Sequence, residues 1–206
     1  MTSLSRRHLL ASGAAAIAGA GLLASPARAV WTDEDDPIPI PPVDLKKIPR
    51  EFRRTVVPYA EAEWPGTIIV DTGSRHLYLV LEGGQAIRYG IGVGRAGFEW
   101  SGIAEIGYKQ MWPRWIPPAD MVARDTNAAK WKDGMPGGPD NPLGARALYL
   151  YQNGRDTLYR LHGTNAPDSI GKAMSSGCIR MLNQDVLELY RRAPIGTKVI
   201  VLGPGV

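Results

Sequence analysis

The sequence predicts a mostly-β domain with one well-defined helix near its C-terminal end. Three observations lead to this fold class. Short runs rich in β-branched and aromatic residues alternate with turn residues. Two of the turns, residues 72–75 and Asn153-Gly154, have the composition of hairpin connections, and Asn-Gly is among the strongest of these signals. A helical apolar pattern with matching end signals is clear only over residues 184–193.

Seven runs are expected to form strands, because each has strand composition and is bounded by turn or breaker residues. They cover residues 67–71, 76–82, 85–92, 104–112, 147–152, 157–161 and 197–202. Residues 113–144 form a long irregular stretch that contains tryptophans, prolines and glycines. A loop of this length inside a compact domain is usually functional or disordered, and its aromatic content favours a folded lid.

The helix at 184–193 has recognisable ends. Asn183 is expected to be its N-cap, and Asp185 suits the positive end of the helix dipole in the first turn. Arg191-Arg192 suit the negative end, and Pro194 prevents the helix from continuing.

Residues 1–29 are expected to be an export signal of the twin-arginine type. Arg6-Arg7 precede a stretch rich in Ala, Gly and Leu, and Ala27-Arg28-Ala29 forms a small-x-small cleavage site. An uncleaved membrane anchor is the alternative, because the apolar stretch approaches the length that spans a bilayer. The localisation expected from a cleaved signal of this type is the periplasm.

The rest of the chain divides into a Pro-rich, charged N-terminal arm, residues 30–65, and a domain expected at 66–206. Residues 51–65 are expected to pack on the domain edge, and the acidic cluster 33–36 to be a solvated face. Without residues 1–29 the chain has 21 basic and 20 acidic residues, so its net charge falls from +4 to +1. This balance gives no support for nucleic-acid binding. No other apolar run is long enough to predict stable membrane insertion after cleavage.

The only cysteine, Cys178, follows the histidine His162 by sixteen residues in LHGTNAPDSIGKAMSSGCIRMLN. A single cysteine in an exported chain cannot form an intramolecular disulfide, so it is either an inert buried thiol or a working one. A thiol attacks a carbonyl only as the thiolate and therefore needs a base. Outside residues 1–29 the only other histidine is His76, at the start of a predicted strand. His162 ends a strand and is the better candidate base.

The segment resembles the catalytic motif of L,D-transpeptidases, the YkuD-domain (ErfK/YbiS-type) family. In that motif a histidine, usually followed by glycine, lies about sixteen residues before [ST]-x-G-C-x-R. Here these positions are His162-Gly163-Thr164 and Ser175-Ser176-Gly177-Cys178-Ile179-Arg180. The family often has histidine where this chain has Ser176, and the serine also occurs within the family. The resemblance covers roughly residues 66–202.

The resemblance implies a YkuD-type β-sandwich and acyl transfer within peptidoglycan. Cys178 would attack the carbonyl of the third stem residue, meso-diaminopimelate, and release D-alanine. Transfer to an amine of a neighbouring stem would then give a 3-3 cross-link. His162 would be the general base and acid, and the backbone carbonyl of Gly163 would orient it. This mechanism requires no cofactor, and the two histidines outside residues 1–29 do not form a zinc site with the one cysteine.

Four further residues are expected to contact or shape the substrate site. They are Arg180, Ser175, Ser176 and Gly177. Arg180 could instead form a structural ion pair with Asp185, and Ser175 could act only in the turn. The region around Trp112, Trp115 and Pro117-Pro118 could line the donor cleft or simply pack in the core.

Three alternatives stay open. The same acyl-enzyme could attach an outer-membrane protein to peptidoglycan, or water could hydrolyse it in an L,D-carboxypeptidase reaction. A non-catalytic wall-binding module belongs to another class, and it predicts that replacing Cys178 leaves function intact.

Overall fold

The structure is a computed structural model that describes residues 36–60, 63–94, 100–173 and 178–203. Every element named below belongs to the unit Thr32–Val206. The expected export signal and the predicted substrate residues Ser175, Ser176 and Gly177 lie outside the described residues. Among the described residues, no helix has the length and apolar character needed to cross a membrane.

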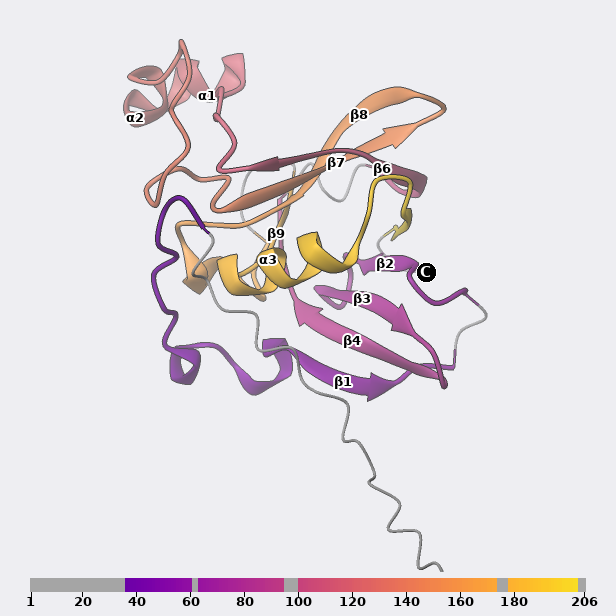
Figure 1. The fold of residues 1–206 in the computed structure, drawn as a ribbon. Helices are drawn as coiled ribbons and strands as arrows, with labels where there is room; N and C mark the ends of the chain where they lie inside the picture. The colour runs from indigo at the N-terminus through magenta and orange to yellow at the C-terminus, as the bar shows by residue number, and fades with distance from the viewer. Residues whose placement is uncertain (1–35, 61–62, 95–99, 174–177, 204–206) are drawn as a thin grey trace, which may run out of the picture. The chain divides into compact units, whose positions relative to one another are not determined.

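Within the described part of the chain, ten strands form one sheet (Figure 1). In chain order they are β1 (Thr55–Pro58), β2 (Ile68–Asp71), β3 (His76–Leu81), β4 (Gln85–Gly90), β5 (Gly92–Val93), β6 (Gly102–Met111), β7 (Arg146–Gln152), β8 (Arg155–His162), β9 (Ile179–Arg180) and β10 (Lys198–Leu202). Their order across the sheet is β1-β4-β3-β2-β10-β6-β7-β8-β9-β5. The β2–β10 and β8–β9 pairs are parallel, and the other neighbours are antiparallel.

All seven predicted strands are present, with ends that differ by a few residues. The run predicted at 85–92 is divided into β4 and β5, because the chain turns at Ile91 from pairing with β3 to pairing with β9. Asn153 and Gly154 have φ values of 52° and 73°, the conformation of a two-residue hairpin turn that matches the twist of its strands. The sequence pattern does not indicate β1 and β9, because β1 ends at a proline in the Pro-rich arm and β9 has only two residues. β1 pairs with β4 at the sheet edge, within the segment expected to pack there.

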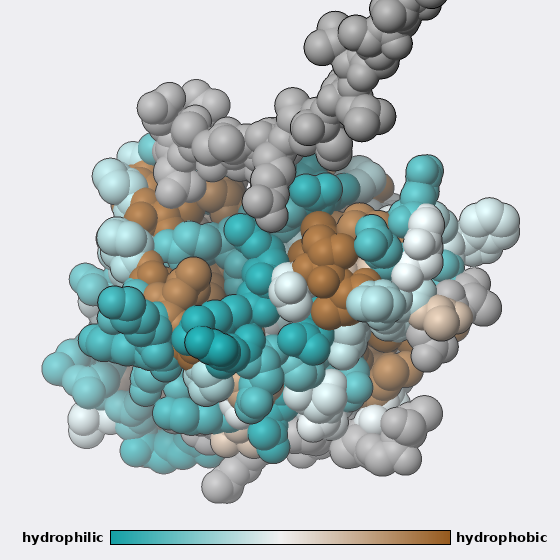
Figure 2. Space-filling model, turned by 90° about the horizontal axis from the view of Figure 1, so that it is seen from below, coloured by the Kyte–Doolittle hydropathy of each residue, from teal (hydrophilic) through white to brown (hydrophobic). Residues whose placement is uncertain are grey.

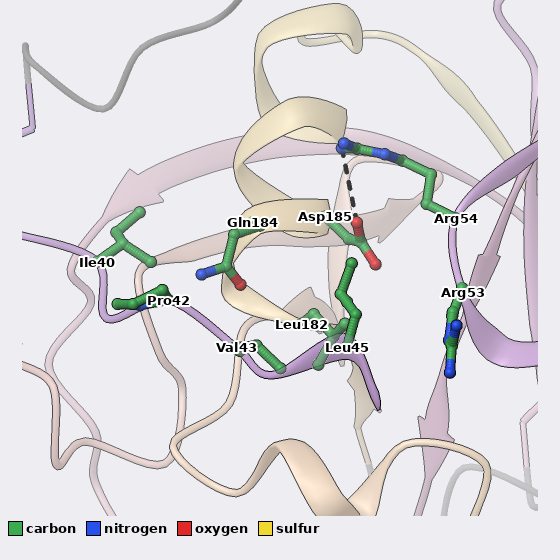
Figure 3. A pocket seen from close by; sticks show the side chains of 9 residues that line it. All are labelled: Ile40, Pro42, Val43, Leu45, Arg53, Arg54, Leu182, Gln184 and Asp185. Carbon is green, nitrogen blue, oxygen red and sulfur yellow. Dashed lines mark ion pairs between the residues drawn. The ribbon is translucent and has the colours of Figure 1, made fainter. Parts of the chain in front are cut away.

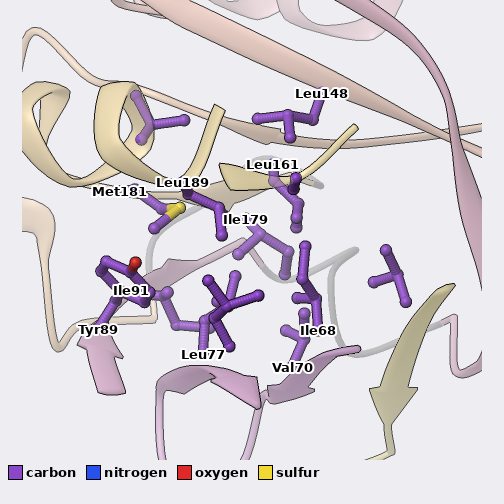
Figure 4. Packing of buried hydrophobic residues seen from close by; sticks show 14 of the residues in the cluster. Ile68, Val70, Leu77, Tyr89, Ile91, Leu148, Leu161, Ile179, Met181 and Leu189 are labelled. Atoms are coloured by element: carbon purple, nitrogen blue, oxygen red, sulfur yellow. The ribbon is translucent and has the colours of Figure 1, made fainter. Parts of the chain in front are cut away.

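The main core lies between the two halves of the sheet (Figure 4). Ile68, Val70 and Leu77 from β2 and β3 point toward Leu148 and Leu161 from β7 and β8. The helix α3 (Asn183–Arg192) adds apolar side chains to the same cluster. Burying each such aliphatic side chain contributes about 1.5–3 kcal/mol, so this packing holds β8 rigidly in place.

The helix α3 begins as expected in sequence position, but the predicted cap is wrong. Leu182 occupies the N-cap position and makes no side-chain cap, while Asn183 is the first helical residue. The Asn183 side chain is buried and bonds to two other segments instead. At the other end Arg191 and Arg192 occupy the last turn as predicted. Lys109 of β6 also donates from Nζ to the carbonyl of Ala193 at 2.8 Å.

The arm is packed into the fold through two satellite clusters of buried residues. Ile38 and Ile40 contact the first cluster, which also contains Trp112, Ala145 and Leu187. Ile48 and Phe52, beside the short 3₁₀ helices η2 (Leu45–Lys47) and η3 (Arg50–Phe52), pack with Ile170 and Leu182. The face that includes the arm and β1 is mainly hydrophilic with separated apolar patches (Figure 2).

The expectation of a solvated face at 33–36 is wrong for Asp36, the one member of that cluster that the structure describes. The Asp36 side chain has no exposed surface and forms an ion pair with Arg146, which begins β7. Its other oxygen accepts a hydrogen bond from Trp112 Nε1. A carboxylate can be buried in this way because a cation and a neutral donor replace its water.

The long stretch 113–144 is folded, as its aromatic content predicts. It contains two short helices that the sequence pattern does not indicate, α1 (Ala119–Arg124) and α2 (Thr126–Ala129), shown at the top left of Figure 1. Trp115 and Met135 form an isolated bridge with two backbone hydrogen bonds of 2.9 and 2.7 Å. Asn141 Nδ2 donates to the carbonyls of Pro113 and Pro136. Trp112 is 8% exposed, so it packs in the core rather than lining an open cleft.

Candidate active site

His162 is the last residue of β8, a strand that is paired on both sides. It lies opposite Ala147 of β7 and opposite Arg180 of β9. Its carbonyl accepts the N–H of Met181 at 2.8 Å, and the residue is 4% exposed. The backbone of His162 is therefore fixed by the sheet at the point where the strand ends.

The imidazole ring is oriented by the next residue along the chain. His162 Nδ1 lies 2.6 Å from the backbone carbonyl oxygen of Gly163. A carbonyl oxygen can only accept a hydrogen bond, so Nδ1 carries the hydrogen in this arrangement. The neutral ring then has an unprotonated Nε2, which is the nitrogen that can accept a proton.

Burial controls the charge of this histidine. Loss of water lowers the pKa of His162 to about 4, while hydrogen bonds with the backbone of Gly163 and Leu143 oppose the shift. The positive charges of Arg180 and Arg160 lower the pKa further. The imidazole is consequently neutral near pH 7, which is the protonation state that a general base requires.

Asn183 holds the segment that carries the Gly163 carbonyl. Its Oδ1 accepts the backbone N–H groups of Ala145 at 3.0 Å and Thr164 at 3.2 Å, and its Nδ2 donates to the Thr164 carbonyl at 3.1 Å. A Cβ at Gly163 would lie 2.1 Å from Asn183 Oδ1, which leaves room only for glycine. Asn183 is thus a positioning residue that the sequence pattern had indicated as a helix cap.

Cys178 lies immediately before β9, the strand that pairs with the end of β8. The parallel register pairs Leu161 with Ile179, which places Cys178 beside the end of β8. The cysteine is free and partly exposed. Burial still raises the pKa of its thiol, and the charge and backbone of Arg160 and the charge of Arg180 oppose that shift. The resting site therefore contains a protonated thiol and a neutral imidazole near pH 7.

Arg180 lies opposite His162 in the register of β8 and β9. Burial lowers the pKa of its guanidinium, and the nearby Cys178 opposes that effect. Asp185, considered above as its ion-pair partner, instead pairs with Arg54 of the arm at 3.5 Å. Arg180 is therefore placed beside His162 and two residues after Cys178.

A separate cavity of about 360 Å³ lies between the arm and the start of α3 (Figure 3). It is lined by Ile40, Pro42, Val43, Leu45, Arg53, Arg54, Leu182, Gln184 and Asp185. Burial raises the pKa of Asp185 to about 6, and Arg54 partly opposes this shift. Neither His162 nor Cys178 lines this cavity. Over the described ranges, no group of three or more His, Cys, Asp and Glu side chains is arranged to hold a metal ion.

A cysteine just before β9 and a buried neutral histidine at the end of the adjoining strand β8 are compatible with thiol-dependent acyl transfer. Comparison with models of known protein families identifies one family. The family model of the YkuD L,D-transpeptidase catalytic domain matches residues 65–201. The chain belongs to this family, as its motif predicts.

Two curated relatives support the assignment. Over 141 residues the chain is 37% identical to "Probable L,D-transpeptidase ErfK/SrfK" of Salmonella typhimurium. This match covers 66% of this chain and 43% of the relative. Over 138 residues it is 36% identical to "Probable L,D-transpeptidase YbiS" of Escherichia coli, covering 64% and 43% of the two proteins. The matched part is thus less than half of the length of these relatives.

Solved structures show the same fold. A Brucella melitensis protein, titled a probable carnitine operon oxidoreductase, is 48% identical with a TM-score of 0.52, and the match covers 77% of this chain and 99% of that one. The word oxidoreductase in that title describes the Brucella melitensis protein and is not transferred to this chain. The structure titled "Ldtfm-avibactam carbamoyl enzyme" is 18% identical with a TM-score of 0.50, covers 68% of this chain and 50% of that one, and shows the fold alone. The predicted fold class, mostly β and of the YkuD type, is confirmed.

Proposed function

We propose that this protein is an exported peptidoglycan L,D-transpeptidase with Cys178 as its nucleophile and His162 as its base. The observation that carries the proposal is the state of His162. Its ring is buried and neutral, and the carbonyl of Gly163 accepts the Nδ1 hydrogen, so Nε2 is the unprotonated nitrogen, at the end of the strand that pairs with β9 next to Cys178.

The proposed reaction has two halves. His162 Nε2 takes the thiol proton, and the Cys178 sulfur bonds to the carbonyl carbon of the third stem residue, meso-diaminopimelate. The tetrahedral intermediate collapses as the bond to D-alanine breaks, and His162 returns the proton to the departing amine. An amine of a second stem then attacks the thioester and passes its proton to His162 as the Cys178 thiolate leaves, and His162 returns that proton to the sulfur.

The remaining assignments follow from this reaction. Backbone N–H groups around Gly177 and Cys178 are proposed to stabilise the oxyanion, because such donors act where negative charge develops. Arg180, beside His162 in the sheet register, is proposed to bind a substrate carboxylate. Ser175 and Ser176 are proposed to shape the same turn.

The proposed protein consists of a signal at 1–29, an arm at 30–65 and a catalytic domain at 66–206, with a periplasmic location. Its proposed partners are peptidoglycan stem peptides. Transfer to an outer-membrane protein or hydrolysis by water would use the same acyl-enzyme, so these reactions differ only in the acceptor.

The test is product analysis by mass spectrometry. The chain from Val30 onward is incubated with purified diaminopimelate tetrapeptide muropeptides, beside Cys178→Ala as the control. We expect dimers that lack one D-alanine, and none with the control. Tripeptides without dimers would identify hydrolysis. Absence of both products, with wild-type behaviour retained by Cys178→Ala in cells, would favour a non-catalytic wall-binding module.

A further inference from the structure

We propose that Arg160 is a further residue of the nucleophile site, and that its backbone N–H and guanidinium together stabilise the Cys178 thiolate. The inference rests on the proposed function, because it takes Cys178 as the nucleophile. Arg160 lies outside the motif that identifies the family, two residues before its histidine.

The register of the sheet places Arg160 beside the cysteine. Leu161 pairs with Ile179, and His162 pairs with Arg180. One step back along both chains, Arg160 lies next to Cys178. Alternate residues of a strand share a face, so Arg160 and His162 project from the same side of β8.

The backbone of Arg160 also contacts the cysteine. A hydrogen bond from this backbone lowers the pKa of Cys178. Only a donor can favour the thiolate over the thiol, so the N–H group is the part of the backbone involved.

The guanidinium of Arg160 is held at two points. Nη1 and Nη2 donate to the two carboxylate oxygens of Asp156, each at 2.8 Å. The guanidinium also lies 4.3 Å from the centre of the Tyr149 ring, whose hydroxyl donates to Gln110 at 3.0 Å. The Arg160 side chain is only 16% exposed. Planar pairing and ring stacking of this kind suit arginine and not lysine, so the charge has a fixed position.

The positive charge of Arg160 helps to stabilise the Cys178 thiolate because the neighbouring base, His162, is neutral before it takes a proton. Burial opposes ionisation of Cys178, and the charge of Arg160 is the largest effect that favours the thiolate. Arg180 acts in the same direction and Asp156 in the opposite one. His162 contributes a positive charge only after it has taken the proton, so the two arginines favour the thiolate from the start of the reaction.

The test measures the pH dependence of Cys178 alkylation by iodoacetamide on the full chain. Cys178 is the only cysteine, so the rate reports on this thiol alone. Arg160→Gln removes the charge, and Arg155→Gln is the matched control, because Arg155 is an exposed arginine at the start of the same strand. We expect the midpoint to rise by about 1 pH unit or more in Arg160→Gln, with a roughly tenfold slower reaction below the midpoint. Arg155→Gln should follow the wild type.

Arg160→Lys supplies a second measurement if Arg160→Gln fails to fold. It keeps the charge but loses the two-point contact with Asp156, so its midpoint should lie between those of the wild type and Arg160→Gln, and above that of Arg155→Gln. Coincident curves for the folded Arg160 variants and Arg155→Gln would overturn the proposal. Alkylation needs no peptidoglycan. A shifted alkylation curve without muropeptide dimers would therefore support the role of Arg160 and count against the transpeptidase function. Muropeptide dimers with unshifted alkylation curves would support the transpeptidase function and count against the role of Arg160.

Discussion

The buried ion pair between Asp36 and Arg146 gives the sharpest stability prediction. The side chains are 0% and 4% exposed, and they join the arm to the first residue of β7. Arg146 also donates from Nη1 to the carbonyl of Ala145 at 2.7 Å. Asp36→Ala would leave the guanidinium buried without its counter-charge and Trp112 Nε1 without its acceptor.

The expected magnitude follows from these contacts. Removing one partner of a buried pair costs about 3–5 kcal/mol, mainly because the other charge stays buried and unpaired. For a domain of this size each kcal/mol lowers the melting temperature by about 2–4 °C, so Asp36→Ala should melt ~6–20 °C below the wild type. Asp44→Ala is the matched control. Asp44 is an exposed aspartate of the same arm that caps only η2, and its loss should cost about 1 kcal/mol or less.

The assay is urea unfolding followed by tryptophan fluorescence, together with thermal melting. The double variant Asp36→Ala/Arg146→Met removes both charges and should be destabilised by less than the sum of the single variants. A loss below about 1 kcal/mol for Asp36→Ala, or strict additivity in the double variant, would refute the reasoning that this pair fastens the arm.

Two further predictions concern pH. Because the pKa of His162 is lowered to about 4, kcat/KM for D-alanine release should hold as the pH falls from 7 to 5 and decrease only near pH 4. Initial rates of D-alanine release, measured from pH 7 to pH 4, would test this. A fall in kcat/KM that begins near pH 6.5 would contradict it. Because the pKa of Asp185 is raised from 3.8 to about 6, the folded state binds the proton more tightly than the unfolded state, so stability falls as the pH rises through this window. Asp185→Asn should therefore be about 1–3 kcal/mol more stable than the wild type at pH 7.5 and similar to it below pH 4. Urea unfolding at both pH values measures this difference. A variant less stable than the wild type at pH 7.5 would show that the ion pair with Arg54 outweighs the cost of burying the charge.

Local signals account for the parts of the fold that the sequence predicts well. Alternation and turn residues indicate strands such as β3 and β7, and Asn153-Gly154 adopts the backbone conformation that its composition requires. The spacing of His162 and Cys178 indicates the candidate site in the same way, because both residues stand in one short motif.

Tertiary partners explain the errors. Asp36 looks solvated in its acidic cluster, and its burial depends on Arg146, 110 residues away. Asn183 has the sequence context of a cap, but two distant segments offer its amide more bonds than the helix end does. Arg160 has no distinguishing signal, since an arginine in a strand usually faces water. Its position beside Cys178 appears only once β8 and β9 pair.

The depth at which Asp36 is buried limits the tether between the folded body and the expected export signal. Only residues 30–35 separate the expected cleavage site from this fixed point. Six residues span at most roughly 20 Å when fully extended. If residues 1–29 were retained as an anchor, the enzyme would work only within a thin shell next to the membrane. Cleavage of the expected signal would release the protein to sample the whole depth of its compartment, so processing of that signal would set the range of action of the proposed enzyme.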